Sequence, residues 1–466
     1  MPPWPVRYNP VRKTQRKASP ASLLVLLLII ALGATVLWWL QSVPGVHAAF
    51  APPVKYLGQK VALNLSLASA RGGVESVEVS LVQGAKATKI GGEVFAPPLS
   101  PQRTLTITVD AKALGLQEGP AQLEVSARDG FWRPLGQKKQ PIRSQPVTVD
   151  YTPPTLEVLS VTQYVYQGGG GLVVYRARGA QTSGVSVGSL AFPGVSGLGA
   201  DSSLFVALFA FPYDAQTTTP VLLTAEDEAG NSASRAVDSH ILPRKFKTDT
   251  VRITEAFLKQ KLPELLPGAS LASSDQLLEG FLTVNRDKRK EAEDRIRAAT
   301  QTTEPKLLWD GVFTAQKNAK VFSNFAEQRT YLFDGKAIDS QVHMGYDLAS
   351  TREAQVAAAN RGKVVLAEPL TIYGNTVILD HGLGLATLYG HLSHIDAKVG
   401  QVVEKGELLG RSGTTGLAIG DHLHFTVLIR GVPVTPLEWW DAKWIREKIS
   451  QPLQAAGIAL EVKSER

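Results

Sequence analysis

The sequence predicts a mainly β, multidomain protein with a transmembrane helix near its amino end. At 466 residues the chain exceeds the size of one compact core. Its 41 glycines and 28 prolines are typical of many turns, and short alternating apolar and polar runs recur along most of its length. We expect a basic tail at 1–20, a transmembrane helix at 21–41, two β-sandwiches at 50–150 and 151–242, a helical connector at 245–304, a β-rich domain at 305–440, and a helix and tail at 441–466.

The segment 21–41 is predicted to cross a membrane. Ala21 to Leu40 carries no charge, and about 20 residues at 1.5 Å per residue cover the ~30 Å hydrocarbon core of a bilayer. No basic residue follows until Lys55, whereas five precede it: Arg7, Arg12, Lys13, Arg16 and Lys17. This asymmetry predicts that residues 1–20 form a cytoplasmic tail and that the remainder lies on the other side of the membrane.

A cleaved signal peptide is the alternative, with Val46-His47-Ala48 as its cleavage site. The apolar run is longer than the roughly 7–15 residues usual in signal peptides. We therefore expect an uncleaved, single-pass anchor in the cytoplasmic (inner) membrane, with the C-terminal domains in the periplasm or outside the cell.

The two segments 50–150 and 151–242 have the pattern of half-buried strands separated by turns. Examples are Val61 to Leu67 in the first and Val221 to Ala225 in the second. Ala225 to Asn231 resembles the late turn of bacterial immunoglobulin-like domains, and Asp150 to Pro154 resembles their lead-in. The resemblance implies two tandem immunoglobulin-like sandwiches. Gly168 to Gly171 lacks the Lys-Ser/Thr of a phosphate loop, so we expect a flexible hairpin there.

The connector at 245–304 shows helical spacing. Apolar residues repeat every three or four positions, and Ser273 and Ser274 are candidate helix caps. The residues that share one helix face are Ile253, Phe257, Leu258 and Leu262, and those that share another are Leu277, Leu278, Phe281 and Leu282. Strands return after Pro305.

Charge and cysteine content exclude two classes of site. The formal charge is +7, but the five basic residues before the apolar run account for most of it, and we find no basic face with interleaved aromatics. We therefore expect no nucleic-acid partner. The chain has no cysteine, so any metal must be bound through nitrogen and oxygen.

Three histidine patterns lie in the C-terminal β-rich segment. They are His343 to Asp347, Tyr389-Gly-His391, and His422-Leu-His424, and this stretch holds six of the eight histidines of the chain. Because residues i and i+2 of a strand point to the same side, His422 and His424 can face one cavity, where one binds metal and the other handles protons.

The donor types in this set indicate a catalytic zinc site. Three protein ligands would leave the fourth tetrahedral position open for water, which zinc activates for hydrolysis of an amide bond. The chain has no His-Glu-x-x-His helix, so the general base must be another group. His391 and His422 have a suitable intrinsic pKa range for this proton transfer.

Residues 320–440 resemble the catalytic domain of lysostaphin-type (LytM) zinc metallopeptidases. His343 with Asp347, Tyr389 to Leu392, and His422 to Phe425 match its His-x-x-x-Asp, Tyr-x-His-Leu and His-x-His-Phe patterns in order. The resemblance implies Zn2+ ligation by His343, Asp347 and His424, catalysis by His391 and His422, and peptidoglycan as substrate. Two departures are Ala326, where glycine is common, and Ala418 to Asp421, which replaces Ser-Thr-Gly-Pro.

These expectations combine into a membrane-anchored zinc metalloendopeptidase, a peptidoglycan hydrolase that cuts amide bonds in stem peptides or cross-bridges. The immunoglobulin-like domains would act as spacers or contact cell-wall protein partners. One alternative is a noncatalytic LytM-type regulator that activates another wall hydrolase, although such regulators characteristically lose zinc ligands. A second alternative is a wall-binding scaffold built on the immunoglobulin-like domains.

Overall fold

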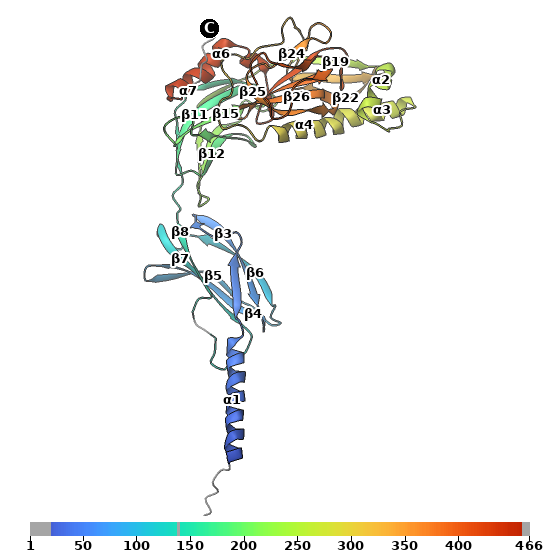
Figure 1. Ribbon diagram of the computed structural model, residues 1–466. Helices are drawn as coiled ribbons and strands as arrows, with labels where there is room; N and C mark the ends of the chain where they lie inside the picture. The colour runs from blue at the N-terminus through green and yellow to red at the C-terminus, as the bar shows by residue number, and fades with distance from the viewer. Residues whose placement is uncertain (1–19, 138–139, 459–466) are drawn as a thin grey trace, which may run out of the picture. The chain divides into compact units, whose positions relative to one another are not determined.

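The computed structural model of the chain describes residues 20–137 and 140–458. The chain forms two compact units, Met1–Thr152 and Pro153–Arg466 (Figure 1). The mainly β, multidomain fold class is confirmed, with one apolar helix near the amino end. Residues 1–19 of the predicted cytoplasmic tail and residues 459–466 of the predicted C-terminal segment lie outside the described residues.

The first unit contains α1 (Pro20–Ser42) and two sheets. Helix α1 has a mean hydropathy of 2.7 and is long enough to cross a membrane. One sheet has the order β1 (Val46–Phe50), β3 (Lys60–Ser69), β6 (Gln102–Asp110). The other has the order β2 (Tyr56–Leu57), β8 (Arg143–Val149), β7 (Gly119–Asp129), β4 (Val74–Gln83), β5 (Lys86–Val94). Both sheets are antiparallel apart from one parallel pair, β2 with β8. Leu63, Leu65 and Leu67 alternate with exposed polar residues and enter the core that the two sheets share.

The second unit begins with another pair of sheets. One has the order β14 (Val195–Ser196), β15 (Leu204–Ala210), β11 (Gly170–Arg178), β9 (Thr155–Val158), and the other β13 (Leu190–Pro193), β12 (Thr182–Val187), β16 (Val221–Glu226), β17 (Ser232–Ala236). Two further strands, β10 (Gln163–Tyr166) and β18 (Ser239–Leu242), pair in parallel. The predicted strands are present in both sandwiches, whereas their immunoglobulin-like relationship stays a prediction.

The predicted flexible hairpin at Gly168 to Gly171 is instead a close-packed junction within the second unit. A Cβ at Gly168 would come within 2.7 Å of the Phe325 ring, and one at Gly169 within 2.4 Å of Glu438 Oε1. The Gly170 N–H donates to Glu438 Oε2 at 2.8 Å. Glycine is needed here because this backbone packs directly on the C-terminal domain.

The connector is helical from Glu255, but its beginning was predicted wrongly. Residues Thr248–Ile253 form β19, which pairs in parallel with β21 (Glu327–Phe333). The helices are α2 (Glu255–Leu265), α3 (Ser274–Thr283), the π-helical turn η1 (Val284–Lys288) and α4 (Arg289–Ala299). Ser273 caps α3 in a reciprocal arrangement with Gln276. These helices bury one face against the C-terminal domain.

An eight-stranded sheet forms the centre of the C-terminal domain. Its order is β20 (Lys320–Ser323), β23 (Tyr346–Ala349), β31 (Leu423–Ile429), β27 (Leu385–Leu392), β26 (Gly374–Gly382), β25 (Gly362–Leu370), β29 (Val402–Val403), and β32 (Val432–Val434) pairs with β31. Smaller sheets have the orders β19, β21, β22 (Lys336–His343) and β24 (Gln355–Ala357), β30 (Leu408–Arg411), β28 (His394–Ile395). Leu383 and Gly384 form the turn between β26 and β27, and a short 3₁₀ turn, η2 (Thr371–Tyr373), precedes β26.

The two faces of the central sheet belong to different hydrophobic clusters. Val377 and Leu379 pack on the side of the second sandwich, whereas Ile378 and Leu388 pack on the side of α2, α3 and α4. This alternation is the period of two that a strand buried on both faces requires.

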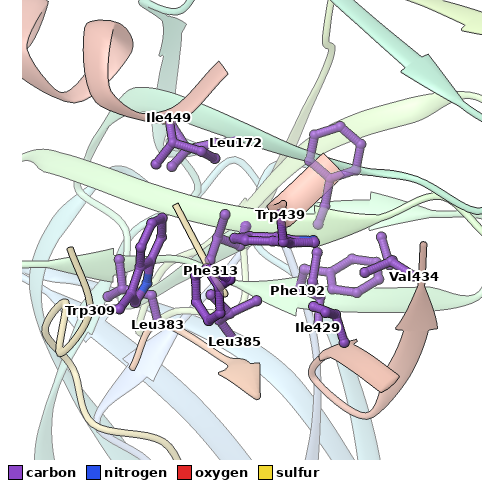
Figure 2. Close-up of a cluster of buried hydrophobic side chains, with 14 of the residues drawn as sticks. Leu172, Phe192, Trp309, Phe313, Leu383, Leu385, Ile429, Val434, Trp439 and Ile449 are labelled. Atoms are coloured by element: carbon purple, nitrogen blue, oxygen red, sulfur yellow. The ribbon is translucent and has the colours of Figure 1, made fainter. Parts of the chain in front are cut away.

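The predicted closing helix consists of short pieces, α5 (Pro436–Trp439), α6 (Ala442–Ile445), η3 (Arg446–Ser450) and α7 (Gln451–Ala455). Figure 2 shows the cluster around Trp439, in which Leu172 and Phe192 of the sandwich join side chains of the C-terminal domain. The second sandwich and the C-terminal domain therefore share one continuous core.

Candidate functional site

The three predicted metal ligands meet where neighbouring strands come together. His343 is the last residue of β22, Asp347 lies in β23, and His424 lies in β31. Asp347 and His424 are directly opposite each other in the antiparallel register. Because residues in register point to the same face of a sheet, this pairing brings the carboxylate and the imidazole together.

The donor atoms of this group converge closely. His343 Nε2 lies 2.9 Å from Asp347 Oδ1 and 3.0 Å from His424 Nδ1. His424 Nδ1 lies 3.0 Å from the same carboxylate oxygen. All three residues are buried.

Hydrogen bonds on the far side of each imidazole determine which nitrogen faces inward. His343 Nδ1 donates to the carbonyl oxygen of Asn324 at 2.9 Å, so Nε2 of the neutral ring carries a lone pair. His424 Nε2 lies 3.0 Å from Thr426 Oγ1, which can accept its hydrogen and leave a lone pair on Nδ1. Two nitrogen lone pairs and a carboxylate oxygen then face one another, and a cation between them would relieve their repulsion.

The geometry fits zinc. Tetrahedral zinc with bonds of about 2.05 Å holds its ligand atoms about 3.3 Å apart, close to the 2.9–3.0 Å found here. Two nitrogens and one oxygen are also the donor types that remain in a chain without cysteine. His343, Asp347 and His424 would hold the ion and leave one position open.

Arg329 completes the surroundings of Asp347. Its Nη2 donates to Asp347 Oδ2 at 2.9 Å, and its Nε lies 3.4 Å from Glu327 Oε1. Burial by itself would raise the pKa of Asp347, but the contacts with His343, His422 and His424 hold this pKa well below its usual value. Asp347 is therefore a carboxylate at any physiological pH.

The two predicted catalytic histidines flank the metal-ligand group. Their ring centroids are 4.7 Å apart, and His422 Nε2 lies 3.4 Å from Asp347 Oδ1. His391 Nδ1 donates to Thr415 O at 2.8 Å, and His422 Nδ1 donates to Gly420 O at 2.7 Å. Nε2 is therefore the ring nitrogen that remains for other contacts, and in His422 it faces Asp347.

Burial and charge shift these two histidines in opposite directions. Burial, followed by the neighbouring imidazoles, lowers the pKa of His391 well below its usual value. Burial is also the largest single influence on His422 and disfavours its charged form, but the hydrogen bond and charge of Asp347, together with the Gly420 carbonyl, outweigh burial and raise the pKa of His422. His391 is thus held neutral, and His422 is the more readily protonated imidazole of the two.

A groove of about 430 Å³ leads to this centre. One wall comes from the connector, through Asp249 to Ile253 and Phe257, and the other from the loop Leu417 to His422. Phe322 and Ile419 line the groove with exposed fractions of 75% and 69%. Asp421 fixes the loop because it accepts hydrogen bonds from Ser412 Oγ at 2.6 Å and the Glu353 N–H at 2.9 Å.

Sequence reasoning did not identify the roles of Arg329, Arg252 or Asp421. Arg329 lies outside the histidine patterns, and Arg252 belongs to the segment 245–304, which was expected to be helical. The departure at Ala326 has a geometric meaning, because this residue has a φ of +57°, in the region that glycine adopts most readily. His381 is buried and bonded on both nitrogens, to Arg361 O at 2.7 Å and Thr387 Oγ1 at 2.8 Å, and so has a structural role.

Comparisons with known proteins support the reading of this region. The profile of peptidase family M23 matches residues 341–436. Peptidoglycan DD-endopeptidase ShyB of Vibrio cholerae serotype O1 is 33% identical over 119 residues, which are 26% of this chain and 27% of the relative. DD-carboxypeptidase/endopeptidase Mpg of Neisseria meningitidis serogroup B is 37% identical over 97 residues, which are 21% of this chain and 22% of the relative.

Among solved structures, the catalytic domain of lysostaphin from Staphylococcus simulans is 27% identical, with a TM-score of 0.24, and the match covers 28% of this chain and 98% of that chain. The chain spans about a quarter of the length of the two curated relatives. The matched region contains the metal-ligand group and both flanking histidines. Residues 341–436 therefore form a domain of peptidase family M23, of the lysostaphin (LytM) type.

Proposed function

We propose that this chain is a membrane-anchored zinc endopeptidase that hydrolyses amide bonds between peptidoglycan peptides. The observation that carries the proposal is the convergence of His343 Nε2, Asp347 Oδ1 and His424 Nδ1 at the floor of an open groove. All three expected ligands are present in this chain, whereas noncatalytic regulators of this type characteristically lose zinc ligands. This favours an enzyme over a regulator. ShyB is named a peptidoglycan DD-endopeptidase, and we extend this DD-endopeptidase activity to the present chain as part of the proposal.

The residues around the ligand group would divide the chemistry of hydrolysis. Zinc, when bound, would supply a Lewis acid and lower the pKa of a water molecule. The imidazoles of His391 and His422 lie beside the ligand group, where they would accept a proton from water, donate one to the leaving amine, and stabilise the oxyanion. Arg329 would hold Asp347 in its ligating orientation.

The anchoring part of the proposal rests on α1 and β1. Helix α1 has the length and apolar character of a membrane span. Strand β1 pairs with β3 through Val46 to Phe50, and Val46, Ala48 and Phe50 are buried. Signal-peptide cleavage after Ala48 would remove more than half of this strand, which favours an uncleaved anchor. The hydrolase domain would then lie on the periplasmic or outer side.

The test uses the full chain in detergent with purified, cross-linked peptidoglycan and mass analysis of the released fragments. We expect cleavage that a chelator abolishes and zinc restores. His422→Ala should keep stoichiometric zinc and lose cleavage, whereas His424→Ala should lose both. His394→Ala, an exposed histidine paired with Asp396, is the matched control and should cleave normally. Stoichiometric zinc without cleavage of any peptidoglycan would instead identify a regulator.

A further inference from the structure

A short loop after β7 exposes two large apolar side chains in the first unit. The loop runs from Phe131 to Gly136. Trp132 is 69% exposed and Leu135 is 87% exposed. The backbone between these two residues has a defined conformation, because hydrogen bonds of the loop itself hold it in place.

Arg133 is the residue that holds the loop. Its guanidinium makes two hydrogen bonds to Asp129, at 2.6 and 3.0 Å, and both side chains are almost fully buried. Arg133 Nη2 also donates to Val43 O at 3.2 Å, in the segment that leaves α1. A buried bidentate pair with a further backbone acceptor gives the loop a defined conformation.

The loop is also attached directly to the last turn of α1. Gln41 Nε2 donates to Gly136 O at 3.1 Å, and the Leu135 N–H donates to Gln41 Oε1 at 3.3 Å. Both polar groups of one helix side chain thus bind the loop backbone. The backbone of Leu135 therefore lies at the level at which α1 ends.

That level corresponds to the boundary of a bilayer. Trp38 and Trp39 lie in the same final part of α1, and adjacent tryptophans at the end of an apolar helix are typical of the membrane–water interface. Gln41 is two residues beyond Trp39, a rise of about 3 Å along the helix. The guanidinium of Arg71 lies 5.2 Å from the Trp39 ring, which places a cation at the depth of lipid headgroups.

We propose that Trp132 and Leu135 insert into the interfacial layer of the bilayer that α1 spans. The occupant of this surface is lipid, because hydrogen bonds attach the loop that carries the two side chains to the end of the membrane span itself. The inference rests on the anchoring part of the proposed function. The first sandwich would then contact the membrane through both the helix and the loop, and its orientation above the bilayer would be restricted.

The test exploits the absence of cysteine from the chain. Single-cysteine variants Leu135→Cys, Leu114→Cys and Leu28→Cys of the full chain are labelled with an environment-sensitive fluorophore and reconstituted into phosphatidylcholine bilayers that carry nitroxide-labelled lipid. Leu114 is the matched control. It precedes β7 in the sequence, whereas the loop follows β7, and the ten residue steps of this strand span roughly 33 Å. Leu114 therefore lies near the opposite end of β7 from the loop. Leu28 reports on the span itself.

We expect strong quenching at positions 28 and 135 and several-fold weaker quenching at 114. Quenching at 28 with equally weak quenching at 135 and 114 would overturn the loop inference and leave the anchor intact. Absence of quenching at 28 would refute the anchor and, with it, the inference that depends on it.

Discussion

Arg329 and Asp347 form a buried pair that determines which carboxylate oxygen faces the histidines. Arg329 Nη2 donates to Asp347 Oδ2 at 2.9 Å, while Oδ1 lies within 3.0 Å of both His343 Nε2 and His424 Nδ1. With one oxygen bonded to arginine, the carboxylate is held in a single rotamer. Arg329 is therefore a positioning residue for the proposed ion, although it does not contact it.

Replacing Arg329 by alanine should weaken metal binding. The loss of an outer partner of a ligand lowers affinity by about 10- to 100-fold, and Arg329→Lys should recover only part of it, because lysine lacks the second donor of the guanidinium fork. Zinc affinity is measured by competition with a chromogenic chelator. Arg295→Ala removes an exposed pair with Glu368 and should leave the affinity unchanged. An unaltered affinity in Arg329→Ala would refute the positioning role.

Arg252 should contribute to substrate binding through the wall that β19 supplies. Peptidoglycan stem peptides carry carboxylates, and a cationic side chain in the groove would attract them. We expect Arg252→Ala to raise KM about fivefold with kcat and zinc content unchanged, and the effect to shrink in about 0.5 M salt. Steady-state kinetics on soluble cross-linked fragments measure this. Lys259→Ala in α2, which does not line the groove, is the matched control.

Gly168→Ala should destabilise the second unit. Gly168 has a φ of +75° and an added Cβ would lie 2.7 Å from Phe325. Gly230 has a φ of +81°, but its Cβ would meet no described atom within 4 Å. Both variants should lose about 1–2 kcal/mol through the left-handed backbone, and Gly168→Ala should lose about 2 kcal/mol more through overpacking. Equal unfolding free energies for the two variants in denaturant titrations would contradict the close-packed junction.

The stability of the second unit should depend on pH through Glu438. Burial raises the pKa of Glu438 from 4.5 to about 7, so the folded state keeps a proton that the unfolded state releases. Its stabilising contribution is complete below pH 4.5 and is lost as the pH rises to about 7, by about 3 kcal/mol. Glu438→Gln should abolish this loss and be the more stable protein at pH 8. Thermal unfolding of the full chain and the variant at several pH values would show parallel curves if Glu438 were not involved.

The convergence of His343, Asp347 and His424 was predictable because each of these residues lies in a short sequence pattern. The patterns around His343, His391 and His424 can be recognised in the sequence because each of them spans only a few residues. The contact between Arg329 and Asp347 was not predictable, because it depends on how β21 and β23 approach each other in space. Nothing in the residues beside Arg329 distinguishes it from a surface arginine.

The strand β19 was missed for a related reason. Thr248 to Ile253 contains only two apolar residues, Val251 and Ile253, and the helical spacing that follows extended our prediction backward over them. Its partner β21 begins some 80 residues later and runs parallel to it, so pairing requires a long crossover that no local signal announces. The glycines at 168–171 were read as flexible because their packing partners, Phe325 and Glu438, lie even farther away in the sequence.

The place of β19 at the edge of the groove determines where this chain could be divided or joined to another protein. A fragment limited to residues 341–436, or one starting near residue 306, would lack β19 and with it one wall of the groove. It would also lack the helices that cover Ile378, Leu388 and Leu428 on one face of the central sheet. Such a piece would be expected to aggregate rather than reveal a more active core. A chimaera that places the M23 domain behind a different N-terminal unit should be joined near Pro153, so that the second sandwich, the helices and the M23 domain stay together.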